Sequence, residues 1–159
     1  MGNYWLMKSE PDVYSIDMLV RDGRQNWDGV RNYTARNNMR AMELGDLAFF
    51  YHSSCEPPGI AGLMRISKLA HPDPSQFDPK SPYYDAKSKR EAPRWDMVTV
   101  EPVQKAPTLV TLEQLKEDPR LEGMVVRQRG MRLSVQPVTA KHFAHVVTLA
   151  GLAGLKLRK

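Results

Sequence analysis

The sequence predicts an α+β domain built around a small curved or closed β-sheet. Segments with strand composition alternate along the chain with short segments that carry helix-capping signals. The 159 residues, of which 42% are hydrophobic, suffice for one domain with a buried core, and we find no internal repeat. Neither a G-x-G-x-x-G nor a P-loop pattern occurs, which gives no support to a nucleotide-cofactor fold. We therefore expect a single domain over residues 1–159 and no cofactor.

Five segments have the composition and length of β-strands. YWLMK begins the fold, and the aromatic-rich LAFFYHS ends at the breaker CEPPG. In the third segment, Gly62 permits a bulge or the close approach of another backbone. The expected strands are residues 4–8, 47–53, 60–70, 95–103 and 131–138.

Four segments carry the start and stop signals of short helices. Ser15 and Thr139 are suited to N-cap positions, and Thr111 with Gln114 has the pattern of a capping box. Glycines follow three of the segments and end them. The expected helices are residues 15–23, 34–45, 111–118 and 139–151.

The chain is basic, with a net charge of +5 and a pI of about 9.4, which is compatible with a polyanionic partner. The positive charge is clustered in KSKREAPR (87–94), RQRGMR (127–132) and the tail KLRK (156–159). Clustering favours a field for phosphate groups over evenly spread charge, although each cluster also fits a solvated loop. The first cluster overlaps residues 73–93, a stretch rich in Pro, Ser and charge that we expect to be a long functional loop.

Several classes of protein are disfavoured. No apolar run is long enough to cross a bilayer, and the N-terminus lacks the basic and apolar segments of a secretory signal. The single cysteine, Cys55, excludes an internal disulfide. His142 and His145 have a spacing that suits metal ligands, but no third ligand can be identified, so we expect no metal. These observations predict an intracellular protein, cytoplasmic in a bacterium and nuclear in a eukaryote, with no membrane partner.

Seven blocks of the sequence carry a resemblance to a known family. They are WLMKSEP (5–11), WDGVRNYTARN (27–37), GDLAFFYHSS (45–54), GIAGL (59–63), the DP-x-S and YYD segment (73–85), RWDMVTV (94–100) and RLSVQPV (132–138). Together they resemble the EVE domain family over nearly the whole chain. The resemblance implies a PUA-like fold, a small β-barrel or curved sheet of about five to six strands with short helices packed around it. It also implies kinship with YTH domains, which read methylated adenine in RNA, and a role as a reader of modified bases in DNA or RNA.

The segment NWDGVRNYTARNN (26–38) combines two aromatic rings with amide, guanidinium and carboxylate groups. A protein that reads one base must give its faces flat walls and its edge hydrogen-bonding groups. We expect Trp27 to be a stacking wall and Tyr33 a second ring or a rim contact. Asn32 and Asp28 are candidates for reading the edge of the base. The alternative for Trp27 is an ordinary core anchor.

Other blocks supply further candidates for the pocket. Tyr51, His52 and Ser53 lie where an expected strand gives way to a loop, although His52 and Ser53 also fit hydrogen bonding that satisfies the strand end. Trp95 is a candidate for a second stacking wall, with a core role as the alternative. The resemblance implies that Ser9, in the SEP block, lines the site.

Basic side chains are candidates for contacts with phosphate groups. Arg31 and Arg36 lie in or beside the aromatic segment, where a guanidinium can bind phosphate or stack on a base. A plain surface salt bridge is the alternative for Arg36. The long loop supplies Lys87, Lys89 and Arg90 for the same role. We therefore predict a non-catalytic protein that binds DNA or RNA carrying a modified cytosine or adenine.

Two other functions remain open. The related ASCH fold, also PUA-like, includes small hydrolases that act on acylated nucleosides with a Lys and a Glu near such a pocket. Lys8 and Glu10 would have these roles here, and a desolvated lysine can act as a base or a nucleophile. The spacing K-S-E differs from the ASCH pattern. An adaptor that binds a partner without contacting nucleic acid is the third class.

Overall fold

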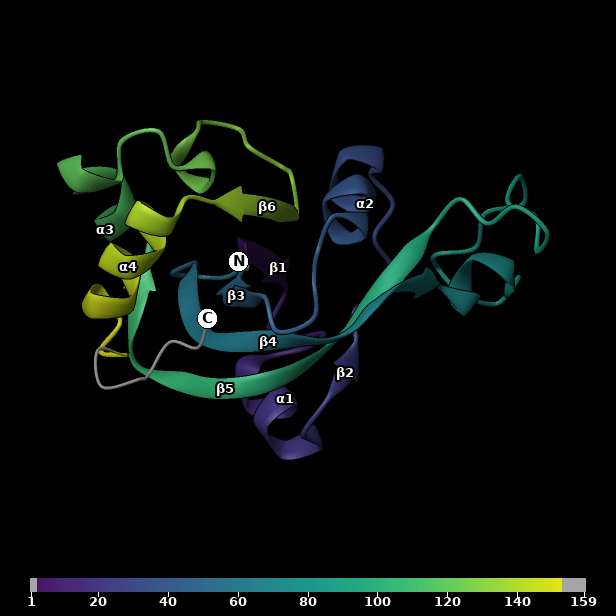
Figure 1. Ribbon diagram of the computed structural model, residues 1–159, viewed down its shortest axis with the longest axis horizontal. Helices are drawn as coiled ribbons and strands as arrows, with labels where there is room; N and C mark the ends of the chain where they lie inside the picture. The colour runs from purple at the N-terminus through teal and green to yellow at the C-terminus, as the bar shows by residue number, and fades with distance from the viewer. Residues whose placement is uncertain (1–2, 153–159) are drawn as a thin grey trace.

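A six-stranded mixed sheet forms the centre of the computed structural model, which describes residues 3–152 (Figure 1). The strand order is β2-β5-β4-β3-β1-β6; β1 runs parallel to β3, and the other neighbours are antiparallel. Among the described residues the hydrogen-bonded order ends at β2 and β6, so the sheet is open and curved. This confirms the predicted α+β class. The strands are β1 (Tyr4–Ser9), β2 (Gln25–Asn26), β3 (Leu47–His52), β4 (Gly59–Pro72), β5 (Asp96–Thr111) and β6 (Val135–Val138).

Three of the four short α-helices begin at the capping residues that the sequence predicted. Ser15 and Thr139 each accept a hydrogen bond from the backbone three residues on, and Thr111 with Gln114 forms a complete capping box. The second helix starts one residue earlier than expected and ends at Arg40 rather than near Gly45. The helices are α1 (Ile16–Asp22), α2 (Tyr33–Arg40), α3 (Leu112–Glu117) and α4 (Ala140–Leu149); short 3-10 helices are η1 (Pro74–Phe77), η2 (Pro119–Leu121) and η3 (Val125–Arg127).

Strand alternation divides the apolar side chains between two cores, one on each face of the sheet. Phe49 packs in the core covered by α3 and α4, where its ring stacks on Phe143 with centroids 4.8 Å apart. Phe50, on the opposite face, packs in the core covered by α1 and α2. Both phenylalanines are fully buried core residues. In Figure 1, α3 and α4 lie together at one end of the sheet, whereas α1 and α2 are separated in the view by the β4 and β5 ribbons.

The long antiparallel pair β4 and β5 departs from the sequence-based boundaries. β5 continues past Pro102 and Pro107 to Thr111, whereas the expected strand ended at residue 103. Proline cannot donate to a ladder, and the β4–β5 register shifts at four places accommodate such breaks. The last strand is shorter than expected, because residues 131–134 lie outside it. The two-residue strand β2 was not predicted.

Residues 73–95 form an excursion between β4 and β5 that extends beyond the sheet at one end (Figure 1). This stretch is ordered by the buried side chain of Gln76, whose Nε2 donates to the carbonyls of Asp73 and Trp95, each at 2.7 Å. Its Oε1 accepts from the Ser88 hydroxyl and from the backbone of Arg94 and Trp95. The expected long loop is therefore a hydrogen-bonded unit.

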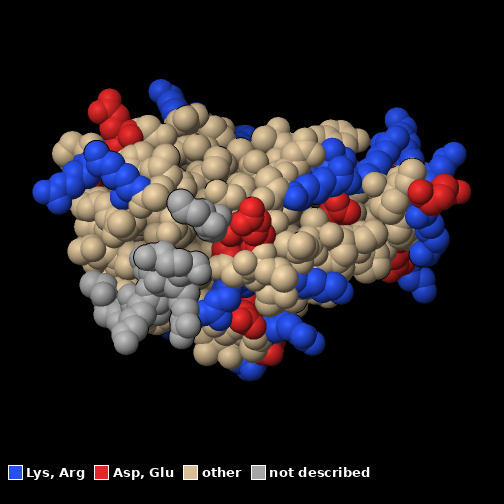
Figure 2. Space-filling view, viewed as in Figure 1, with Lys and Arg blue, Asp and Glu red and all other residues tan. Residues whose placement is uncertain are grey.

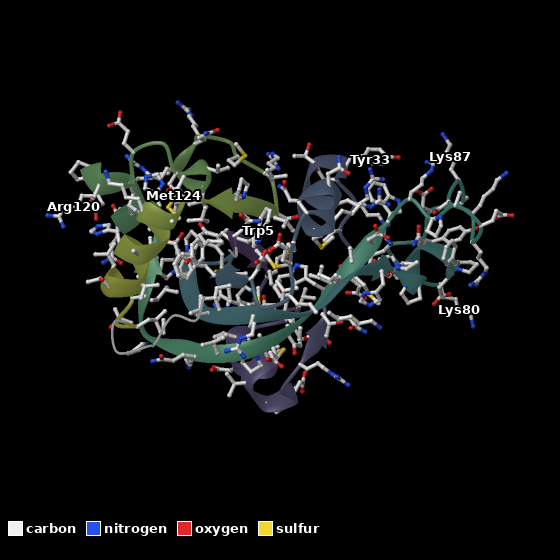
Figure 3. All side chains as sticks on the ribbon, in the orientation of Figure 1. Trp5, Tyr33, Lys80, Lys87, Arg120 and Met124 are labelled. Atoms are coloured by element: carbon white, nitrogen blue, oxygen red, sulfur yellow. The ribbon has the colours of Figure 1, made fainter. Side chains whose placement is uncertain are left out.

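Lys and Arg side chains gather on this end of the molecule, with acidic side chains among them (Figure 2). Lys80 and Lys87 extend from the excursion away from the sheet (Figure 3). The basic tail 156–159 lies outside the described residues. In the part of the chain that the structure describes, no helix has both the length and the hydrophobicity needed to span a bilayer.

Candidate functional site

An open cavity of about 530 Å³ lies beside the carboxyl end of β1. Its lining comes from side chains within residues 8–14, 25–31, 53–54 and 131–134, together with Tyr83 from the excursion. The volume is within the range of small-molecule binding sites. Four of the predicted pocket residues, Ser9, Trp27, Asp28 and Ser53, are brought together here.

Trp27 is both a core residue and a wall of this cavity. Its side chain is 7% exposed and packs edge-to-face on Phe50, with ring centroids 5.3 Å apart at 81°. The Trp27 backbone N–H donates to the carbonyl of Val98 at 2.8 Å, which fixes residues 25–27 against β5. The indole is large enough to pack in the core on one side and to line the cavity on another, and its role as a stacking wall for a base stays a prediction.

A buried carboxylate organises the residues that follow Trp27. Asp73 is fully buried, and its Oδ2 accepts from the Gly29 backbone at 2.8 Å and from Arg31 Nη1 at 3.1 Å. Its Oδ1 accepts from the backbone and the hydroxyl of Ser75, at 2.8 Å and 2.6 Å. Burial by itself would raise the pKa of Asp73, but these donors outweigh it and hold the pKa below its usual value.

Asp28 lies on the rim of the cavity, where its carboxylate remains accessible to solvent. Partial burial, and then the nearby Asp73 carboxylate, raise the pKa of Asp28 above its usual value. A ligand group that donates a hydrogen bond to Asp28 would stabilise the charged form and offset this cost.

Arg31 holds the cavity wall together rather than presenting a vacant guanidinium. Its nitrogens donate to the carbonyls of Val30 and Tyr83, to the Asp73 carboxylate and to the Ser75 hydroxyl, at 2.9–3.1 Å. The guanidinium also lies over the rings of Tyr83 and Trp95, about 5.5 Å from each centroid. Because these donors are engaged, a phosphate would have to compete with protein partners for Arg31.

Tyr33, Trp95 and Arg36 form a stack outside the cavity lining. The rings of Tyr33 and Trp95 are stacked with centroids 4.7 Å apart, and the Arg36 guanidinium lies over Tyr33 at 4.7 Å. Trp95 is buried, and its Nε1 donates to Asp85 at 2.8 Å, whereas Tyr33 is 50% exposed. Arg36 donates to the carbonyl of Arg94 at 2.8 Å. These contacts connect α2 to the excursion (Figure 3 labels Tyr33 at this junction).

Three other predicted pocket residues lie outside the cavity lining. The Asn32 side chain caps α2 by accepting from the backbone of Ala35 at 2.9 Å. Tyr51 is buried in the core beneath α4, and burial, followed by the charge of Cys55, raises its pKa to about 12. His52 Nε2 accepts from the backbone of Ile16 at 3.1 Å, and burial lowers the pKa of this imidazole. His52 therefore makes a structural hydrogen bond at the end of β3, which was the alternative to a contact with the base.

Ser9 and Ser53 both line the cavity and are joined through their backbones. The Ser53 backbone donates to the Ser9 carbonyl at 3.0 Å, and the Ser9 hydroxyl donates to the carbonyl of Tyr14 at 2.6 Å. The lone pairs of the Ser9 hydroxyl are left as acceptors for a ligand.

Tyr83 is the main lining residue that sequence reasoning missed. Its ring lies directly over Gly29, where an added Cβ would be 2.7 Å from two ring carbons. Gly29 also has φ +79°, so both the conformation and the contact require glycine. The WDG and YYD blocks contain these residues, but their contact spans more than 50 positions and has no local signal. Asn26 was also missed; its Oδ1 accepts from the Thr99 hydroxyl at 2.7 Å, which leaves the amide nitrogen as a donor.

The remaining candidates lie at the edge of the cavity or beyond it. Lys8 and Glu10 both line the cavity; Lys8 Nζ donates to the carbonyl of Met131 at 3.0 Å, and burial lowers the pKa of Lys8. Lys87, Lys89 and Arg90 are exposed on the excursion and do not line the cavity. Residues 3–152 hold no cluster of three acidic, His or Cys side chains suited to a metal, and His145 pairs with Asp118 at 2.6 Å.

The open mixed sheet, with helices on both faces and a cavity at the end of β1, defines a PUA-like domain. The chain belongs to the EVE domain family, whose sequence model matches residues 3–149.

Individual relatives support this assignment. The chain is 45% identical to mouse (Mus musculus) thymocyte nuclear protein 1 over 94% of this chain and 74% of that protein. A crystal structure of a Pseudomonas putida protein is 52% identical, with a TM-score of 0.90 over 92% of this chain and 99% of that one. Human THYN1, solved in complex with DNA containing 5-methylcytosine, is 44% identical, with a TM-score of 0.88 over 93% of this chain and 97% of that one.

Proposed function

We propose that this protein binds nucleic acid and holds one modified base, extruded from its stack, in the cavity beside Trp27. The observation that carries the proposal is an aromatic wall and hydrogen-bonding side chains at one open cavity, in a chain 44% identical to a protein solved with 5-methylcytosine-containing DNA. A cytosine methylated at C5 is accordingly the leading candidate for the base.

The chemistry of the lining suits such a base. Extruding a base costs a few kcal/mol, and stacking on an aromatic side chain returns about 1–3 kcal/mol. Trp27 and Tyr83 offer ring surface, and Val30 offers an apolar contact for a methyl group. The exocyclic amino group of cytosine is a donor, which matches the accessible carboxylate of Asp28. The amide nitrogen of Asn26 supplies a further hydrogen-bond donor, and the hydroxyl oxygen of Ser9 supplies a further acceptor.

Phosphate contacts are assigned to the exposed cations of the excursion, Lys87, Lys89 and Arg90. Arg90 lies over the ring of Phe77 at 4.7 Å, which holds its guanidinium at the surface. Arg31 and Arg36 are assigned instead to positioning the cavity wall and the excursion, because their donors bind protein groups.

Tyr83→Ala should weaken binding to an oligonucleotide with one 5-methylcytosine by about 5- to 150-fold, as expected for the loss of roughly 1–3 kcal/mol of stacking. Fluorescence anisotropy with methylated and plain duplexes of one sequence measures the effect, and the unaltered protein should prefer the methylated duplex. Tyr84→Ala is the matched control, since Tyr84 is similarly exposed and does not line the cavity. Equal effects of the two substitutions, or no salt-sensitive binding by the unaltered protein, would overturn the proposal.

The hydrolase alternative has one observation in its favour, the lowered pKa of Lys8 at the cavity. Against it, Lys8 Nζ is engaged as a donor to Met131, a contact that favours the charged, non-nucleophilic form. We expect no release of cytidine when the protein is incubated with N4-acetylcytidine and the mixture is followed by chromatography. Turnover that disappears in Lys8→Ala would contradict the non-catalytic assignment.

A further inference from the structure

The segment 127–134, between η3 and β6, forms a side of the cavity that the proposed base contacts use only in part. Met131, Arg132 and Ser134 belong to the lining. The segment is anchored to β1, because Lys8 donates from its backbone to the Ser134 carbonyl at 2.8 Å and from Nζ to the Met131 carbonyl at 3.0 Å. Its place at the cavity is therefore set by hydrogen bonds to the same strand that ends at Ser9.

The three arginines of RQRGMR (127–132) differ in what they contact. Arg127 is engaged, since its guanidinium donates to the carbonyls of Asp118 and Lys116 at 3.2 Å and 3.0 Å. Arg129 and Arg132 are exposed, and no residue that the structure describes forms a hydrogen bond or an ion pair with either guanidinium. At Gly130, between the two arginines, an added Cβ would have no other heavy atom within 4 Å. Two unengaged cations thus lie on or next to one rim of the cavity.

This rim is separate from the basic excursion. In Figure 1, α2 lies between the start of β6, which follows the segment, and the excursion that carries Lys87. A nucleic-acid strand with one base in the cavity has phosphates on both sides of that base, so a basic group on each side of the mouth would contact the strand twice.

We propose that Arg129 and Arg132 bind the phosphates on one side of the extruded base, while the excursion binds those on the other side. The strand then crosses the mouth of the cavity between two basic contacts. This inference rests on the proposed function only for the presence of a base in the cavity; the phosphate contacts themselves do not depend on the modification.

The test compares two double variants with the same change in charge. Arg129→Glu/Arg132→Glu alters the rim, whereas Arg120→Glu/Lys141→Glu alters exposed cations on η2 and α4 (Figure 3 labels Arg120 far from the excursion). The rim variant should bind methylated and plain oligonucleotides about tenfold more weakly or worse, with their affinity ratio unchanged. The slope of log affinity against log salt should fall by about 0.7–0.9 for each phosphate that the variant no longer neutralises. An equal loss in the control variant, or an unchanged slope, would overturn the inference.

Truncated oligonucleotides locate the contact along the strand. When the oligonucleotide is truncated at the modified base on the side that faces the rim, the rim substitutions should cause no further loss of affinity. When it is truncated on the other side, the rim substitutions should weaken binding as much as they do for the full-length oligonucleotide. Equal sensitivity with both truncations would refute a one-sided contact. If the unaltered protein shows no preference for a modified base, the proposed function fails, yet the rim is still tested by its effect on plain oligonucleotides.

Discussion

Replacement of Trp27 by alanine is expected to remove the preference for a modified base and to lower the free energy of unfolding by about 3–5 kcal/mol. Both effects follow from the position of the indole, which is 7% exposed, packs on Phe50 and lines the cavity. Binding to methylated and plain oligonucleotides should be compared at a temperature where circular dichroism shows that the variant is folded.

Met39→Ala separates the two effects. Met39 is fully buried in the same core as Trp27 but does not line the cavity. Its truncation should cost about 2–5 kcal/mol of stability and leave the preference intact. Trp27→Phe, which keeps an aromatic face, should retain part of the preference. A folded Trp27→Ala protein that still discriminates would show that the indole is not the stacking wall.

Asp73→Asn is expected to destabilise the protein by about 3–5 kcal/mol at pH 7, the typical cost of removing one partner of a buried ion pair. An asparagine satisfies the site in neither orientation. If the asparagine NH₂ takes the Oδ2 position, it meets the donors of Gly29 and Arg31, which it cannot accept. If the NH₂ takes the Oδ1 position, it meets the backbone and hydroxyl donors of Ser75 instead. Urea denaturation measures the loss. Asp12→Asn, at an exposed position, is the control and should change stability by less than about 0.5 kcal/mol.

The same substitution has a pH signature. Because the folded-state pKa of Asp73 lies below its unfolded value, the carboxylate contributes its stabilisation above the unfolded pKa of about 3.9 and loses it as pH falls through the folded pKa. The difference in stability between the unaltered protein and Asp73→Asn should therefore be constant near neutral pH and shrink below about pH 4. A difference that does not depend on pH would show that the effect is steric rather than electrostatic.

Local signals in the sequence were sufficient for much of the fold. The caps at Ser15, Thr111 and Thr139 function as expected, because an N-cap hydrogen bond joins residues only three positions apart. The aromatic-rich strand expected over residues 47–53 is observed as β3, because strand composition is a local property of the sequence. The second half of β5 was missed, because its continuation past Pro107 to Thr111 depends on the partner strand β4.

For the candidate site, the sequence indicated the kinds of residue that line the cavity better than it indicated which residues contact one another. Trp27 and Asp28 line the cavity, and their contacts with a base stay predictions, whereas the neighbouring Tyr33 stacks on Trp95 and Arg36 lies over Tyr33, both outside the lining. Nothing in a single sequence distinguishes an arginine that faces a ligand from one whose donors bind protein carbonyls. That Arg31 and Asp73 would meet, 42 positions apart, could not be inferred from spacing.

By itself, the sequence determined the α+β class, three of the helix caps and, through the blocks that it shares with the EVE domain family, the identity of the domain. Only the tertiary structure decided which polar and aromatic side chains meet at the cavity. The reason is physical: capping and alternation depend on residues within a few positions of one another, whereas the wall formed by Tyr83 over Gly29, and the free rim around Arg132, exist only after distant segments have packed.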